Sequence, residues 1–80
     1  MIRLTKHAAE SIEKRGIALE WIERTLEMPD FARPDPRDRT LTRSFKGIAE
    51  AGGRILRVVH RPEGNDILIA TVHFDRGAKP

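Results

Sequence analysis

The spacing of the apolar residues changes once along this chain, and that change limits the possible folds more than any other feature. From Lys6 to Met28 apolar residues recur every three or four positions, which is the spacing of a helix with one buried face. From Thr40 to Phe74 they alternate or form short runs, which is typical of strands. The charged, proline-containing segment Pro34 to Arg39 separates the two patterns. This order predicts an α+β fold with its helices first.

Two helices are expected before the connector, at about residues 5–15 and 19–28. Thr5 can offer its hydroxyl to the free N–H groups of the first turn, and Gly16 readily adopts the left-handed conformation that ends a helix. Pro29 ends the second helix because its ring is incompatible with a continuing helical turn.

Three strands are expected after a connector at residues 30–39, at about residues 40–48, 54–61 and 66–74. The turn signals Ala51-Gly52-Gly53 and Glu63-Gly64-Asn65 separate these strands, so they should form two successive antiparallel hairpins. Phe31 to Arg33 is a candidate edge strand. We therefore expect a single domain, residues 1–80, in which two N-terminal helices pack on a three- to four-stranded antiparallel β-meander.

Composition narrows the class of protein. With 80 residues, of which 39% are hydrophobic, the chain can bury one modest core. The absence of cysteine excludes disulfide scaffolds, cysteine nucleophiles and thiolate zinc sites. No apolar run approaches the roughly 20 residues of a membrane span, and no signal peptide is recognisable. We therefore expect a cytoplasmic protein with no membrane partner.

The positive charge is concentrated in the later part of the chain. The formal net charge is +3, and residues 1–30 carry minus one while residues 31–80 carry plus four. A basic C-terminal part suits a polyanion such as RNA, DNA or an acidic protein segment. Most of the cations are arginine, an enrichment that also arises from codon usage, so charge alone does not identify the partner.

Hairpin loops with an even number of residues would determine which strand residues oppose each other. Closing the first hairpin at Ala51-Gly52 places Lys46 opposite Arg57, and closing the second over residues 62–65 places His73 on the other face from Arg57. Two opposed cations repel by roughly a few tenths to 1 kcal/mol, which a bound phosphate would relieve. The alternative is an acidic side chain from a helix or loop that neutralises them.

The three histidines are the candidates for proton transfer. His7 falls in the first turn of the first helix, where the helix dipole favours the neutral ring that a general base needs, although a solvated surface position is the more common explanation for such a histidine. His60 and His73 fall about 20 Å apart in this register at ~3.3 Å per residue, too far to act as a pair. No metal-ligand, phosphate-loop or nucleophile-elbow motif is present, and we expect neither a metal nor a cofactor.

Several short motifs together resemble a bacterial family, that of the domain of unknown function 4258. These motifs are Thr5-Lys6-His7-Ala8, Arg15-Gly16-Ile17, Glu27-Met28-Pro29, Arg54-Ile55-Leu56-Arg57-Val58-Val59 and Ala70-Thr71-Val72-His73-Phe74. Ser11 and His73 depart from the family pattern, which more often has Arg and Tyr there. The family is similar in layout to RelE-like and BrnT-like ribonuclease toxins, so the resemblance implies a RelE-like fold and a toxin of a toxin–antitoxin pair.

The leading hypothesis is therefore a metal-independent endoribonuclease toxin. RNA supplies its own nucleophile, the 2′-hydroxyl, so the protein needs only to position it, move a proton and stabilise charge on the phosphate. The partners would be RNA, free or bound to the ribosome, and a cognate antitoxin protein. The candidate catalytic residues are His7, Arg57 and His73, and the candidate RNA-binding residues are Arg43, Lys46, Arg61 and Arg76.

Two other hypotheses remain open at this point. The first is a non-catalytic binding module whose basic sheet surface engages nucleic acid or an acidic protein, favoured by the lack of a clear acid–base pair in the expected register. The second is a small component of a larger assembly. Substitution of Arg57 separates catalysis from binding, because a catalyst loses turnover while a binder loses affinity.

Overall fold

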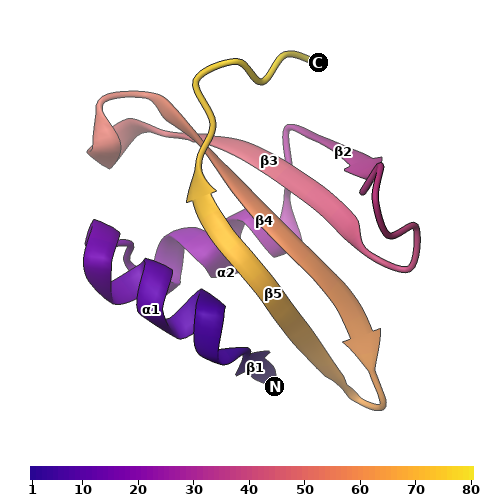
Figure 1. Ribbon diagram of the computed structural model, residues 1–80. Helices are drawn as coiled ribbons and strands as arrows, with labels where there is room; N and C mark the ends of the chain where they lie inside the picture. Colours follow the sequence, from indigo (N-terminus) through magenta and orange to yellow (C-terminus); the bar gives the residue numbers. More distant parts are fainter.

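The computed structural model describes all of residues 1–80 and shows two helices and one five-stranded sheet (Figure 1). The elements in chain order are β1 (Ile2–Leu4), α1 (Lys6–Arg15), α2 (Leu19–Glu27), β2 (Phe31–Pro34), β3 (Thr42–Ile48), the 3₁₀ turn η1 (Ala49–Ala51), β4 (Arg54–Glu63) and β5 (Asp66–Phe74). Both helices precede the main strands and pack on the sheet, so the α+β class is confirmed.

The sheet has one more strand than expected and is mixed rather than antiparallel. Its order is β1-β5-β4-β3-β2, with β1 parallel to β5 and every other pair antiparallel. The extra strand forms because the residues before α1 hydrogen-bond to β5: Ile67 N donates to Met1 O and Thr5 N donates to Ile69 O. The three expected strands and the candidate edge strand are present and antiparallel, so the expectation was wrong only in lacking the parallel strand β1.

The ends of α1 follow from local sequence signals. The Thr5 hydroxyl accepts a hydrogen bond from Ala8 N at 3.1 Å, which satisfies one of the free donors of the first turn. Gly16 ends the helix at φ 63°, and the following Ile17 is buried. The same Thr5 hydroxyl donates to Ala70 O at 2.8 Å, so the start of α1 is attached to β5.

The first hairpin differs from the expected register by one residue. Its connection spans residues 49–53, an odd number, because η1 continues into Gly52 and Gly53, which have φ values of 71° and 79°. Ile48 consequently pairs with Arg54 across this five-residue loop. A two-residue closure at Ala51-Gly52 was the wrong prediction.

This one-residue change moves Lys46 away from Arg57. Lys46 pairs with Leu56, and the residue opposite Arg57 on β3 is Phe45. Lys46 Nζ instead donates to Met28 O at 2.7 Å and lies 3.5 Å from an Asp30 carboxylate oxygen. The predicted repulsion between Lys46 and Arg57 does not exist, and an acidic residue from a loop neutralises this lysine.

The second hairpin closes more tightly than expected. Glu63 pairs with Asp66 across the two-residue loop Gly64-Asn65, where Gly64 has φ 60°. The expected four-residue closure over residues 62–65 was wrong. Since both loops hold an even number of residues, this difference shifts the strands without exchanging their faces.

A bulge in β5 is what exchanges the faces of the residues that follow it. Thr71 pairs with Val59 and Ile69 pairs with His60, so Ala70 between them has no partner on β4. An unpaired residue reverses the alternation of side chains along the strand.

The bulge brings His73 onto the face that carries Arg57. Ile69 precedes the bulge, Val72 follows it, and both are completely buried against the helices. His73, next to Val72, therefore points the other way and lies directly opposite Arg57. The expectation that these two residues lie on different faces was wrong.

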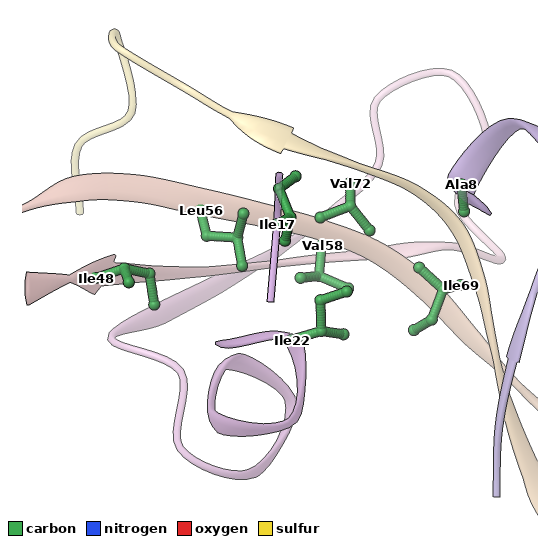
Figure 2. Packing of buried hydrophobic residues seen from close by; sticks show 8 residues of the cluster. All are labelled: Ala8, Ile17, Ile22, Ile48, Leu56, Val58, Ile69 and Val72. Carbon is green, nitrogen blue, oxygen red and sulfur yellow. The ribbon is translucent and has the colours of Figure 1, made fainter. Parts of the chain in front are cut away.

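The hydrophobic core fills the space between the helices and one face of the sheet. Figure 2 shows its eight side chains; Ala8, Ile17 and Ile22 come from the helical part, and Ile48, Leu56, Val58, Ile69 and Val72 come from the end of β3, β4 and β5. We call this side of the sheet the covered face and the other side the open face. No helix lies on the open face (Figure 1).

Candidate functional site

Arg57, His73 and Asp75 form a polar cluster on the open face. Arg57 Nη1 donates to Asp75 Oδ2 at 3.0 Å, and Arg57 Nη2 contacts His73 Nε2. Because a guanidinium can only donate, His73 Nε2 accepts, and the ring proton resides on Nδ1. The Arg57 and Asp75 side chains are only 18% and 22% exposed, so these polar groups are largely removed from water.

The surroundings of the cluster keep His73 neutral. Partial burial lowers the pKa of His73, and the neighbouring charge of Arg57 lowers it further. Burial also lowers the pKa of Arg57, with the charge of Arg43 as the next cause. In addition, Arg57 Nε is buried without a hydrogen-bond partner. The cluster thus combines a neutral imidazole with a guanidinium whose Nη1 and Nη2 point to Asp75 and His73, a combination that suits an incoming anion.

A second ion pair lies beside the first on the open face. Arg43 Nε donates to Asp35 Oδ2 at 3.0 Å, and Asp35 Oδ1 accepts from the backbone N–H groups of Arg37 and Asp38. These backbone hydrogen bonds, followed by the Arg43 side chain, lower the pKa of Asp35. Asp35 is 8% exposed, so the connector folds its carboxylate back onto the sheet. Two arginines, each held by one aspartate, therefore lie close together.

Aromatic rings extend the cluster towards the edge of the sheet. Phe45, opposite Arg57, stacks on Phe31 of β2 with ring centroids 4.6 Å apart and an interplanar angle of 13°. The Arg33 guanidinium lies 5.2 Å from the Phe31 centroid. Alternation of an aromatic and a basic residue, two positions apart, occurs in both β2 and β3, and sequence reasoning overlooked it.

A groove of about 540 Å³ runs beside these rings and reaches the cluster. Arg33, Arg43, Phe45 and Asp75 line it together with residues 77–80. Arg33 Nη2 also donates to Lys79 O, so the C-terminal segment borders the groove. The open face is therefore hollowed next to its charged residues.

Two of the expected site residues do not join the cluster. His7 is exposed in the first turn of α1, and its side chain makes no hydrogen bond to Arg57, His73 or any other residue. Lys46 belongs to the covered side of β3, where Met28 and Asp30 engage it. Neither residue therefore belongs to the cluster.

Two further expected residues lie around the cluster. Arg61 is exposed on β4, four residues beyond Arg57. Arg76 is exposed, directly follows Asp75 and lines a separate groove. Both have positions from which they can contact a polyanion bound across the open face.

His60 lies on the other side of the sheet. Its Nε2 is 2.8 Å from the Oγ of Ser44, a residue that is 4% exposed, and burial lowers the pKa of His60. No charged side chain contacts the ring. The hydroxyl and imidazole satisfy each other, so His60 fits a structural role.

No three His, Cys, Asp or Glu side chains come together anywhere in the chain to make a metal-ligand set. Neither helix has the length and apolar character that crossing a bilayer requires.

Comparison with known families identifies the group to which the chain is related. The profile of the family described as domain of unknown function 4258 (DUF4258) matches residues 4–74. The chain belongs to this family. No curated protein and no solved structure matches it. The matched region of this DUF4258 domain includes Arg43, Arg57 and His73 and ends one residue before Asp75.

Two residues of the site in this DUF4258 domain were not found by sequence reasoning. Asp75 stands two positions after His73, so strand alternation places both on one face, and that spacing was an available signal. Asp35 had no comparable signal, because its burial depends on a contact with Arg43 on a different strand.

Proposed function

We propose that this DUF4258 domain cleaves RNA without a bound metal, at the cluster of Arg57, His73 and Asp75 on the open face. The observation that carries the proposal is the contact between the Arg57 guanidinium and the neutral His73 ring, with Asp75 on the same guanidinium. A cation for a phosphate and a neutral base beside it are the two groups that cleavage by the 2′-hydroxyl requires.

The reaction follows from these positions. An RNA phosphate binds between Arg57 and Arg43, and Arg57 Nη2 turns from His73 Nε2 to a phosphate oxygen. The freed Nε2 then takes the proton of the adjacent 2′-hydroxyl, and the 2′-oxygen forms a bond to phosphorus. The bond from phosphorus to the 5′-oxygen breaks, and that oxygen takes a proton from water. The products are a 2′,3′-cyclic phosphate and a 5′-hydroxyl.

The remaining groups of the open face hold and orient the strand. Asp75 and Asp35 fix the directions of the two guanidinium groups through hydrogen bonds of 3.0 Å each. Phe45 lines the groove, and Phe31, which stacks on it and is partly exposed, offers an apolar surface for a base. Arg61 extends the positive surface along β4 for a flanking phosphate.

The resemblance to RelE-like and BrnT-like toxins supports a toxin of a toxin–antitoxin pair, with a RelE-like arrangement of helices and sheet. Under this proposal the cleavage takes place in the cytoplasm, on RNA that is free or bound to the ribosome. A cognate antitoxin would block the open face with an acidic or apolar segment, because that face has arginines beside a groove that Phe45 also lines.

The test uses the purified chain and two oligonucleotides that differ by one atom. One is DNA with a single ribonucleotide and the other is DNA throughout. We expect cleavage only after the ribonucleotide, with a 2′,3′-cyclic phosphate identified by mass spectrometry. Arg57→Gln and His73→Gln should each lose cleavage, whereas Arg39→Gln, which removes an exposed connector charge, should retain it. Unfolding midpoints measured in parallel identify any variant that fails to fold.

One observation favours a second function, which is binding of RNA or of an acidic protein segment without cleavage. His73 Nε2 is already occupied by Arg57, and no other histidine joins the cluster. If the folded wild-type chain binds RNA but leaves both oligonucleotides intact, and Arg57→Gln only weakens binding, the proposal of cleavage is wrong. The open face would then be a binding surface for RNA or for an acidic protein segment.

A further inference from the structure

A second groove, separate from the aromatic one, lies at the end of the sheet where β4 begins and β5 ends. Its volume is about 570 Å³, and three arginines, Arg15, Arg54 and Arg76, line it together with Gly52, Gly53 and Asp75. These arginines come from the end of α1, the start of β4 and the segment after β5. The fold therefore gathers three cations that lie far apart in the sequence.

The three cations have no acidic partner of their own. None of them takes part in an ion pair, whereas Arg3, Arg24, Arg43 and Arg57 all do. The one carboxylate that lines the groove, Asp75, is bound to Arg57. The charge of this groove is therefore positive and uncompensated, in contrast to the two ion pairs of the neighbouring site.

Arg54 is held in place with its outer nitrogens free. Its guanidinium carbon lies 4.0 Å from the centroid of the Phe74 ring, and its Nε donates to Ala51 O at 3.0 Å. Nη1 and Nη2 make no hydrogen bond in the chain. A planar cation fixed on a ring with two unused donors is arranged for a bidentate contact with a phosphate.

The wall beside Arg54 is open. Gly52 and Gly53 have no side chain, and a Cβ placed on either would meet no atom within 4 Å. A ligand can therefore approach the backbone of this turn and the three arginines together. Positive φ values at both glycines make larger residues strained here, which keeps this wall free of side chains.

We propose that this groove is a phosphate-binding site, in which Arg15, Arg54 and Arg76 hold a phosphate group of a nucleotide or of an RNA strand. The extension to a strand rests on the proposed function, because Asp75 lines this groove and also belongs to the cluster at which cleavage is proposed. Arg15 is close enough to that cluster for its charge to contribute to the lowered pKa of His73. A strand bound at the cluster would place a neighbouring phosphate in this groove.

The first test measures phosphate binding alone. The ¹⁵N-labelled full chain is titrated with adenosine 5′-monophosphate, with inorganic phosphate and with adenosine, and amide shifts are followed at Gly52, Gly53, Phe74 and Arg76. We expect shifts with both phosphates and none with adenosine. Arg54→Gln and Arg76→Gln should each weaken the binding of adenosine 5′-monophosphate at least fivefold. The charge-matched control Arg39→Gln should weaken it less than twofold. Absence of shifts at millimolar phosphate, or equal weakening by Arg39→Gln, would overturn the proposal.

The second test separates a free nucleotide from an RNA strand. His73→Gln should bind adenosine 5′-monophosphate as the wild type does, even if it has lost cleavage, so failure of the proposed function leaves the phosphate site measurable. With the cleavable oligonucleotide, Arg76→Gln should raise KM severalfold and leave kcat unchanged. A 2′-O-methyl oligonucleotide that shifts Arg43 and Thr71 amides but not Gly52 and Gly53 overturns the strand assignment and leaves a site for free nucleotides.

Discussion

The two faces of the sheet each carry one half-buried histidine, and the contrast between them shows what distinguishes a candidate site from ordinary packing. Burial lowers the pKa of both His60 and His73. His60, on the covered face, has the Ser44 hydroxyl as its partner. His73, on the open face, touches Arg57, which also binds Asp75. A lowered pKa is common to both histidines, so the charged groups around His73 are what make it the candidate.

The most direct test of this contrast replaces each of the two histidines by glutamine in a separate variant. His73→Gln should lower kcat/KM for the ribonucleotide substrate roughly 10²- to 10⁴-fold, the usual contribution of a general base. His60→Gln, whose side chain can still hydrogen-bond to Ser44, should change it less than about threefold. Equal losses in both variants would show that the two histidines do not differ in role.

A second comparison uses two neighbours on β4 that point to opposite faces. Leu56 is completely buried in the core, whereas Ile55 is partly exposed and lines the groove with Arg54. Leu56→Ala should lower the free energy of unfolding by about 2–5 kcal/mol, because it leaves a cavity between sheet and helices. Ile55→Ala should cost about 1 kcal/mol, since less apolar area is buried there. Urea unfolding of both variants measures the difference, and similar losses would contradict the assignment of faces.

The third prediction concerns the two aspartates of the connector. Asp35 binds Arg43 and two backbone N–H groups, whereas Asp38 is exposed and binds only Thr40. Asp35→Ala should lower the free energy of unfolding by about 1–3 kcal/mol, because it leaves Arg43 without its partner. Asp38→Ala should cost about 0.5 kcal/mol. Thermal unfolding at neutral pH tests this, and a larger loss for Asp38→Ala would contradict it.

The smallest expected effect is the response of stability to mild acid. Both His60 and His73 have a pKa below the ordinary value of 6.5, so the unfolded chain binds protons more readily than the folded one. The free energy of unfolding is therefore constant above about pH 7 and falls as the pH drops through 6.5 towards 5. Asp30, Asp35 and Asp38 have a lowered pKa, and they add a separate loss below about pH 4.

Variants separate the contributions of the two faces to this response. His60→Gln and His73→Gln should each flatten the decline of the unfolding free energy between pH 7 and pH 5, and the two effects should add because the rings lie on opposite faces. Urea unfolding at closely spaced pH values measures it. A decline that persists unchanged in the double variant would assign it to other groups.

Features encoded within a few residues were predictable from the sequence, and features that depend on how strands meet were not. Thr5 and Gly16 mark the ends of α1 because capping involves neighbouring residues only. Arg57 and His73 were named as candidates, yet their contact depends on the closure of the second hairpin at Gly64-Asn65 and on the bulge at Ala70. The register of a strand shifts with one residue in a turn, and single-sequence patterns do not resolve that difference.

The bulge at Ala70 also has a consequence for how the family can diverge. It acts as a half-period phase shift in β5, because Ile69 before it and Val72 after it share one side. Deletion of the Ala70 codon would remove the bulge and let β5 pair with β4 in regular alternation. Val72 would stay buried and His73 would stay opposite Arg57, because both keep their partners on β4. A relative that is one residue shorter at this point can therefore keep the same site, whereas a relative of equal length whose β5 runs without the bulge would turn this histidine towards the helices.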